Sequence, residues 1–343
     1  MKLLNDRQKS TYEWYKNRFN ELHIEAKSNG GRLVRHDIWR SEYYSNPYLL
    51  LEEDETILER FADVFTNSLD IGADGKIGLT PMIDNDARFG RLFTEIIEET
   101  NWRGILSKGS IGYASEQLKA YFNDGVPLGV RMFEKVKPEP KNCLFKFSKK
   151  QYVHEMFKYG RFRISPASYY AKGSHIKAIK DLETVRNYRL KAIREILKGE
   201  SHFEFQGQRN PILNGVIPIQ FEMGNYYLLC TCNEISRRMP TDFESDAVLM
   251  IKDKAEFIKR LKDELLISYP DWEFIEGDVY YYDPYNDTIK DRNQELYKHF
   301  SYAYQKEHRC IIRPKTGQGA AGSLEPFLVE IGPLDDIAEI ITV

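Results

Sequence analysis

Apolar residues in the first third of the chain recur at steps of three and four, the spacing typical of an amphipathic helix. Three stretches carry such a stripe: residues 6–28, 52–65 and 84–99. In the first of them Tyr12, Tyr15, Phe19 and Leu22 are three or four positions apart. The second stretch opens with four acids, which suit the positive end of a helix dipole. The pattern predicts a mostly helical domain over residues 1–135.

The pattern changes at residues 136–140, where prolines and charged residues form a joint typical of a linker. From residue 141 onwards, short apolar runs and period-two alternation predict strands. Helical stretches lie between these strands at irregular intervals, without the regular alternation of a doubly wound sheet. This order predicts an α+β fold with a mixed, mainly antiparallel β core and accompanying helices over residues 141–343.

Several elements of this second domain follow from the same pattern. Helices are predicted over residues 174–199 and 291–304, and a strand over 308–313. Two strand-like runs, residues 216–222 and 226–232, flank Met-Gly-Asn and predict a hairpin.

The segment from Cys143 to Tyr170 predicts strand, helix and strand in succession. A short apolar run precedes a helical stretch that Gly160 ends, as glycine does at a helix C-terminus. Two basic residues, Lys146 and Arg163, interrupt strands that otherwise suit a buried core. These two residues are the first candidates for a functional site.

A second candidate lies far downstream, where Glu307 precedes the predicted strand 308–313. A carboxylate among basic residues can stabilise a cationic centre or act as a base. The alternative is that Glu307 pairs with Arg309 or Lys306 at a solvated strand end. Spacing alone does not separate the two interpretations.

Charge is distributed unevenly along the chain, although the net charge is only -3. Residues 141–200 contain 15 Lys and Arg against 5 Asp and Glu, whereas residues 201–343 contain 15 against 24. A basic segment of this kind is typical of binding to nucleic acid or polyphosphate. The alternative is that it packs on the acidic remainder of the chain.

The basic segment supplies four candidate phosphate contacts: Lys177, Lys180, Arg189 and Arg194. Asp181 and Glu183 lie within the same predicted helix. They are either site carboxylates or partners of nearby basic residues within that helix.

Membrane and metal signals are weak. No run approaches the eighteen apolar residues of a membrane helix, and the N-terminus lacks a signal-peptide core, which predicts a cytoplasmic protein. Cys230 and Cys232 resemble half a metal site, but no second Cys or His pair has suitable spacing. Two positions apart in a strand, they are expected to be buried thiols, and no metal is predicted.

The order strand, helix, glycine, strand, with a basic residue in the first strand and a glutamate opening a late strand, resembles the ADP-ribosyltransferase fold. Phe145-Lys146-Phe147-Ser148 occupies the family's first motif. Lys146 stands where the family has His or Arg, and Phe147 where it has a small residue. Residues 160–170 resemble the family's second strand, with its glycine, serine and following aromatics.

The chain is also similar to a bacterial family from abortive-infection loci. The shared motifs are residues 144–147, 306–309 and 330–337. Together the resemblances cover roughly residues 141 to 343.

The resemblance implies NAD as a substrate, no metal, and Glu307 as the catalytic carboxylate. It implies NAD-binding roles for Lys146, Ser148, Arg163, Ser165, Tyr169 and Tyr170. Lys146 and Arg163 would hold the adenosine or pyrophosphate, a tyrosine would stack on nicotinamide, and Ser165 would bond to it. We therefore expect Lys146 and Glu307 to face one cleft.

The resulting hypothesis is an NAD-dependent ADP-ribosyltransferase of the toxin or phage-defence kind. The basic segment favours a nucleic acid as acceptor, RNA over DNA or protein, and a cognate antitoxin protein is a further candidate partner. Two alternatives stay open: a nucleic-acid-binding module without catalysis, and an NAD glycohydrolase that transfers ADP-ribose to water.

Overall fold

The computed structural model describes residues 4–80, 82–106, 118–123, 125–136, 140–171, 182–191, 193–205, 207–212, 216–287, 293–315, 320 and 323–343. It is a mixed α+β structure whose sheets are mainly antiparallel, as the sequence predicts.

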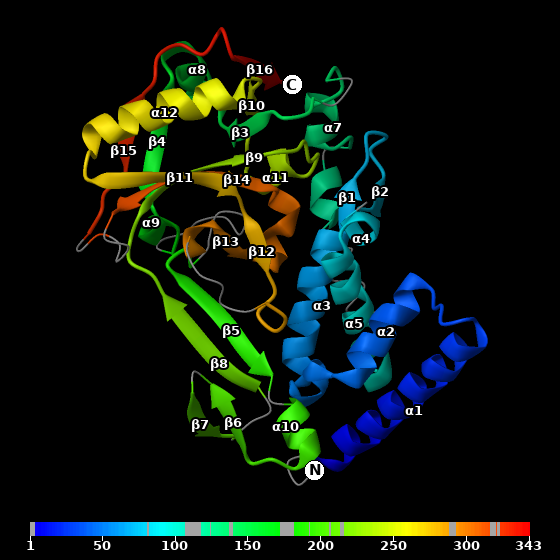
Figure 1. The fold of residues 1–343 in the computed structure, drawn as a ribbon. Coiled ribbons are helices and arrows are strands. Elements are labelled where there is room, and N and C mark those ends of the chain that lie inside the picture. Colours follow the sequence, from blue (N-terminus) through cyan, green and yellow to red (C-terminus); the bar gives the residue numbers. More distant parts are fainter. Residues whose placement is uncertain are drawn as a thin grey trace.

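Helices fill the N-terminal part of the molecule (Figure 1). They are α1 (Asp6–Ser28), α2 (Arg35–Ser45), α3 (Asp54–Ser68), α4 (Met82–Asn85), α5 (Ala87–Arg103) and α7 (Leu128–Met132), with 3-10 turns η1 (Tyr48–Leu51) and η2 (Ala120–Phe122). The three predicted apolar stripes are confirmed as α1, α3 and α5. Asp86 caps α5, because its carboxylate accepts a hydrogen bond of 2.9 Å from the backbone N–H of Arg88. A small hairpin, β1 (Leu69–Ile71) and β2 (Ile77–Leu79), follows α3.

The main sheet carries the C-terminal part of the chain. Its central order is β11 (Trp272–Asp278), β14 (Glu307–Pro314), β9 (Tyr227–Cys232), β3 (Leu144–Ser148), β10 (Ala247–Ile251) and β16 (Ala338–Thr342). Strand β4 (Arg161–Pro166) pairs with both β9 and β15 (Phe327–Glu330). Strand β9 pairs with β4 through Leu228 and with β3 through Cys232, so β3 and β4 diverge along one side of β9.

Three two-stranded sheets and several short helices complete the second part. The sheets pair β5 (Val185–Lys191) with β8 (Val216–Glu222), β6 (His202–Phe205) with β7 (Gln208–Pro211), and β12 (Tyr280–Tyr282) with β13 (Tyr297–His299). The helices are α8 (Lys150–Tyr159), α9 (Ala167–Ala171), α10 (Ile193–Lys198), α11 (Met239–Asp242), α12 (Lys254–Ser268), η3 (Gln294–Leu296) and η4 (Phe300–Gln305).

Three local predictions are wrong in whole or in part. Of the helix expected over residues 174–199, Ile193–Lys198 is helical as α10, but Val185–Lys191 is a strand, because β8 supplies a partner for every residue of β5. The helix expected over residues 291–304 is two 3-10 turns around β13. The expected hairpin does not form, because β8 pairs with β5 while β9 enters the main sheet. In each case pairing with a distant segment overrides the local pattern.

Two helices cover one face of the main sheet. Val153 of α8 and Phe257, Leu261 and Leu265 of α12 pack on Leu229 and on other strand residues of this face. The opposite face has two smaller cores, one with Phe145 and Cys232 against α7 and α11, and one with Leu228 and Ile311 against α9. Figure 1 shows α8 and α12 together on one side of the sheet.

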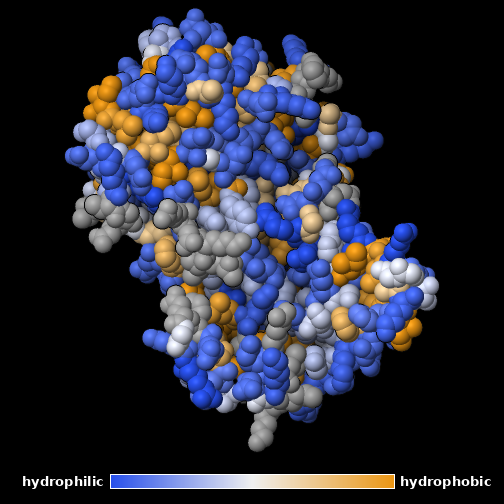
Figure 2. All heavy atoms as spheres, in the orientation of Figure 1, coloured by the Kyte–Doolittle hydropathy of each residue, from blue (hydrophilic) through white to orange (hydrophobic). Residues whose placement is uncertain are grey.

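The helical part packs directly against the second part of the chain. Its core contains Ile193, Tyr285, Phe300 and Ala303 beside the helical residues. Figure 2 shows an apolar patch at the outer corner where α1 meets α2, on which Ile24, Val34 and Ile38 are exposed by 67%, 66% and 45%. Among the described residues, no helix combines the length and the apolar character that a membrane crossing requires.

Gly160 provides a test of the junction between α8 and β4. It has a φ of 61°, and a Cβ there would lie 2.1 Å from the carbonyl oxygen of Gly332. We expect Gly160→Ala to lower the free energy of unfolding in urea by about 2–3 kcal/mol, because left-handed strain adds to a backbone clash. Gly30→Ala is the matched control, since Gly30 has a φ of 65° with nothing within 4 Å of its Cβ. Equal losses in the two variants would contradict the clash.

A buried carboxyl joins the helical part to the loop after β12. Glu95 is 3% exposed and accepts a hydrogen bond from the Tyr48 hydroxyl. That hydroxyl also accepts one of 3.1 Å from Arg60, whose guanidinium pairs with both oxygens of Asp283 at 2.9 Å. Burial raises the pKa of Glu95 to about 7, although Tyr48 and Arg60 act in the opposite direction. Glu95 therefore binds a proton near neutral pH in the folded state.

We expect Glu95→Gln to stabilise the protein at pH 8 by about 2–3 kcal/mol and to change stability little near pH 5. The folded-state pKa is raised, so the stability that protonated Glu95 supplies at low pH is lost as pH rises through about 7. Urea unfolding of both proteins at pH 5, 6.5 and 8 measures this. Glu59→Gln, on the exposed side of α3, controls for the loss of a carboxylate. A stability difference that does not vary with pH would contradict the assignment.

Candidate active site at the start of strand β14

Glu307 is the first residue of β14 and is held firmly by its backbone. Its N–H donates to the Tyr281 hydroxyl at 2.8 Å, and its carbonyl accepts a 2.9 Å hydrogen bond from Val279 N–H. The preceding residue, Lys306, has a φ of 47°, a left-handed conformation that is uncommon for residues other than glycine. This turn directs the chain from η4 into the sheet.

Both oxygens of the Glu307 carboxylate are paired with cations. Oε1 accepts a hydrogen bond of 2.7 Å from Lys298 Nζ, and Oε2 accepts one of 3.0 Å from Arg309 Nε. The residue is only 5% exposed. The pairing with Arg309, which was the alternative to a catalytic role, is thus present, but the strand end is buried, not solvated, and the second cation is Lys298 in place of Lys306.

Arg309 and Glu183 extend this pair into a buried charge cluster, defined here as Glu183, Lys298, Glu307 and Arg309. Arg309 has no exposed surface, and its two terminal nitrogens donate to Glu183 at 2.8 and 2.7 Å. Lys298 Nζ also donates to Gln305 Oε1 at 3.0 Å and lies 3.9 Å from Glu183. Each charge in the cluster therefore meets an opposite charge, as buried charges require.

The cluster keeps its two carboxylates ionised. Burial alone would raise the pKa of Glu307, but Lys298 and Arg309 outweigh it and hold the pKa below the ordinary glutamate value. In the same way Arg309 and then Lys298 overcome burial and lower the pKa of Glu183 to about 2. Burial alone would lower the pKa of Arg309, but Glu183 and Glu307 raise it above the ordinary arginine value, so Arg309 stays charged.

The register places several predicted NAD-binding residues on the Glu307 face of the sheet. Cross-strand partners share a face, so Glu307 lies on the same side as its partner Cys232 and as Leu228, four positions earlier in β9. Ser165 is the partner of Leu228 and joins this face, and Arg163 follows by alternation. The sheet thus places Glu307, Ser165 and Arg163 on one face, with β9 between the strand of Glu307 and that of the other two.

Two tyrosines of α9 lie near this face. Tyr170 packs with the core around Leu228, and burial raises its pKa, with further contributions from Cys230, Glu183 and Glu307. The guanidinium of the exposed Arg163 lies 4.8 Å from the ring centroid of Tyr169.

Lys146 and Ser148 lie on the other face. Phe145 is the partner of Cys232 and shares the Glu307 face, so Lys146 points to the opposite one. Its ammonium donates to the carbonyl oxygen of Cys230 at 2.8 Å, where β3 and β4 diverge from β9. The expectation that Lys146 and Glu307 face one cleft is therefore wrong, since alternation along β3 separates them.

Of the four candidate nucleic-acid-binding residues, the structure describes the side chain of Arg189 alone. Arg189 pairs with Glu52 at 3.1 Å and lies 5.6 Å from the Tyr285 ring, so it packs within the chain. Lys177 and Lys180 lie outside the described residues, as does Asp181. Arg194 belongs to α10, and its side chain lies outside the described part.

The cysteines are free thiols. Burial raises the pKa of Cys230 to about 12 and also raises that of Cys232. Within the described ranges, no group of three His, Cys, Asp or Glu side chains is arranged to hold a metal ion.

Lys298, Gln305 and Tyr281 complete the surroundings of Glu307, and sequence reasoning did not identify them. Lys298 lies in the stretch that was predicted to be helical, and nothing in its neighbourhood distinguishes it from a solvated lysine. The run of aromatic residues around Tyr281 favours a strand but does not indicate this contact.

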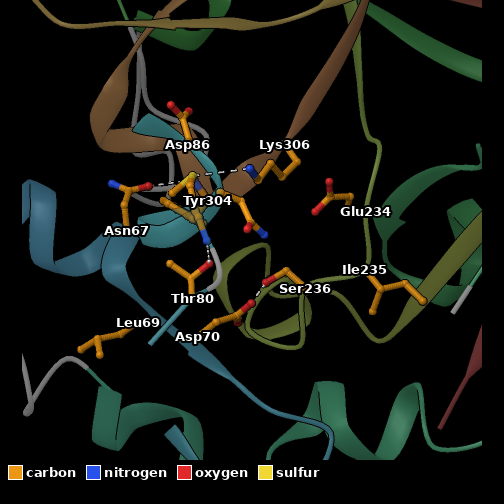
Figure 3. A pocket seen from close by; sticks show the side chains of 12 residues that line it. Asn67, Leu69, Asp70, Thr80, Asp86, Glu234, Ile235, Ser236, Tyr304 and Lys306 are labelled. Atoms are coloured by element: carbon orange, nitrogen blue, oxygen red, sulfur yellow. Dashed lines mark hydrogen bonds between the residues drawn. The ribbon is translucent and has the colours of Figure 1, made fainter. Parts of the chain in front are cut away.

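A cavity of about 310 Å³ opens beside Lys306, between the helical part and the start of β14 (Figure 3). Both parts of the chain line it: Asn67 and Asp70 come from the helical part, and Glu234 and Tyr304 come from the second part. Glu307 does not line this cavity or either of the two smaller ones described near it.

Comparison with known proteins gives no further identification. The chain matches no protein-family model, no curated protein sequence and no solved structure.

Proposed function

We propose that this protein is an NAD-dependent ADP-ribosyltransferase of the toxin or phage-defence kind, with an ADP-ribosyltransferase-like fold and Glu307 as its catalytic carboxylate. The acceptor is nucleic acid, with RNA favoured by the basic segment. The observation that carries the proposal is an ionised Glu307 on the sheet face that also bears Arg163 and Ser165.

The chemistry follows from charge. Breaking the bond between nicotinamide and ribose develops positive charge on the ribose, and an ionised carboxylate stabilises that charge. Lys298 and Arg309 hold Glu307 ionised at physiological pH. The exposed guanidinium of Arg163 is the proposed partner of the pyrophosphate, and Tyr169 beside it is the proposed platform for a base. Lys146 is not part of this proposed NAD site, because its ammonium donates a hydrogen bond to the Cys230 carbonyl oxygen in β9.

A second candidate rests on the burial of Glu307. Its two oxygens are bonded to Lys298 and Arg309, and it lines none of the three cavities. In this alternative the charge cluster is structural, and the chain is a nucleic-acid-binding module without catalysis.

Incubation with NAD labelled in its adenylate moiety, together with RNA, DNA or cell lysate, separates the candidates. Label on RNA is the expected result, and label on DNA or protein would change the acceptor. Free ADP-ribose without labelled polymer identifies a glycohydrolase. Absence of turnover, combined with RNA binding that weakens steeply with salt, supports the binding module. Co-purification from the native host tests for an antitoxin.

A further inference from the structure

The cavity beside Lys306 contains charges that do not neutralise one another. Lys306 contributes an ammonium, whose contact among the described residues is the Met82 sulfur at 3.4 Å. Asp70 accepts hydrogen bonds from Ile71 N–H at 2.8 Å and from the Ser236 hydroxyl at 3.4 Å. In the described ranges, neither Lys306 nor Asp70 has an ion-pair partner within 4.0 Å, and the same holds for Glu234 at the rim.

This arrangement differs from that of the buried charge cluster. The charge cluster pairs every buried charge, and Asp86, which also lines the cavity, caps α5 and lies 3.7 Å from Arg88. Burial raises the pKa of Asp70, although the hydrogen bonds from Ile71 and Ser236 and the charges of Arg238 and Arg237 act in the opposite direction. Figure 3 shows the side chains of Asp70, Glu234 and Lys306 at separate points around one hollow. A ligand with both signs of charge would satisfy all three.

The remaining walls suit an organic ligand. Leu69, Met82 and Ile235 provide apolar surface, and Tyr304 provides an aromatic ring. That ring already meets one cation within the chain, because the Arg238 guanidinium lies 4.1 Å from its centroid. A volume of about 310 Å³ accommodates a molecule the size of an amino acid.

We propose that this cavity binds a free α-amino acid. The ammonium of the ligand pairs with Asp70 and Glu234, its carboxylate pairs with Lys306, and its side chain lies against Tyr304 and Met82. The site is distinct from the Glu307 carboxylate and does not depend on the proposed transferase activity.

The test uses the full chain and the twenty free L-amino acids at about 10 mM, a concentration that detects weak sites. At least one should raise the melting temperature, and calorimetry then gives its dissociation constant. The amide of that amino acid lacks the carboxylate, and its N-acetyl derivative lacks the ammonium. Each should bind at least about tenfold more weakly, because each loses a charge-assisted contact.

Variants connect binding to the cavity. Asp70→Asn and Lys306→Met should each weaken the amino acid at least about tenfold. The matched controls Asp263→Asn and Lys262→Met, exposed on α12, should bind as the wild type does. If Asp70→Asn fails to fold, Glu234→Gln at the rim replaces it. The proposal is overturned if no amino acid shifts the melting temperature, if both derivatives bind as well as the parent, or if the cavity variants bind unchanged.

Discussion

Replacing Arg309 with leucine is expected to lower the free energy of unfolding by about 3–5 kcal/mol, the usual cost of breaking a buried ion pair from one side. Arg309 has no exposed surface and donates to Glu183 through two nitrogens and to Glu307 through a third. It also donates to the Glu295 carbonyl at 2.7 Å. Without it, both buried carboxylates lose hydrogen bonds, and Glu307 keeps only Lys298 while Glu183 keeps Arg186 at 3.4 Å and Lys298 at 3.9 Å. Urea unfolding at pH 7 measures the loss.

Acid pH should reduce this difference. The folded-state pKa of Glu183 is depressed to about 2, so the stability from its pairing is present above the ordinary pKa near 4.5 and is lost as pH falls through about 2. Arg313→Leu on the same strand is the matched control, because Arg313 is 15% exposed and one of its two partners, Glu273, is 39% exposed. It should cost less than Arg309→Leu, because water can reach Arg313 and Glu273. A similar loss in both variants would show that burial of the pair has no special effect.

Elements set by local pattern were predictable from the sequence. Residues 6–28 form α1 as expected, because a stripe of apolar residues with a polar remainder favours one helix face against a core. Strand β10 was predictable too, since an apolar run as short as Ala247–Ile251 suits a strand buried on both faces. In these cases local preference and tertiary packing agree.

Elements set by distant partners were not predictable. The basic residues of β5 alternate with apolar ones, but their spacing also fits a helix, and the pairing with β8 decides the outcome. In the stretch around Lys298, β13 gains its strand geometry from β12, about seventeen positions earlier in the chain. A single sequence contains no direct record of such pairings.

In the candidate site too, features set by the local pattern were predictable and features set by distant partners were not. Arg163 is a candidate because it is a charge within an apolar strand, and Glu307 because it is a carboxylate among basic residues ahead of one; the register places both on one face. Lys146 is a candidate for the same reason as Arg163, but it lies on the opposite face. The sequence does not predict this, because alternation within one strand does not say how two strands align. The role of Lys298 depends on its hydrogen bond to Glu307, nine residues later in the chain, and an irregular turn lies between the two residues.

If the proposed reaction is correct, Glu307→Gln should lower NAD turnover by about a hundredfold or more, as expected for a positioned electrostatic group. The substitution keeps the shape of the side chain and removes its charge. NAD affinity should change far less, because the charge that Glu307 faces develops mainly in the transition state. Nicotinamide release gives turnover, and equilibrium binding gives affinity.

Glu183→Gln is the matched control for this experiment. It removes the same charge from the same cluster and also deprives Arg309 of a partner, but it lies outside the β14 position proposed to face the ribose. A structural effect predicts similar losses of turnover and of melting temperature in both variants. A catalytic role predicts that Glu307→Gln loses turnover beyond what its melting curve explains, whereas Glu183→Gln does not. Unchanged turnover in Glu307→Gln would remove Glu307 from catalysis and leave the charge cluster as a structural feature of the sheet.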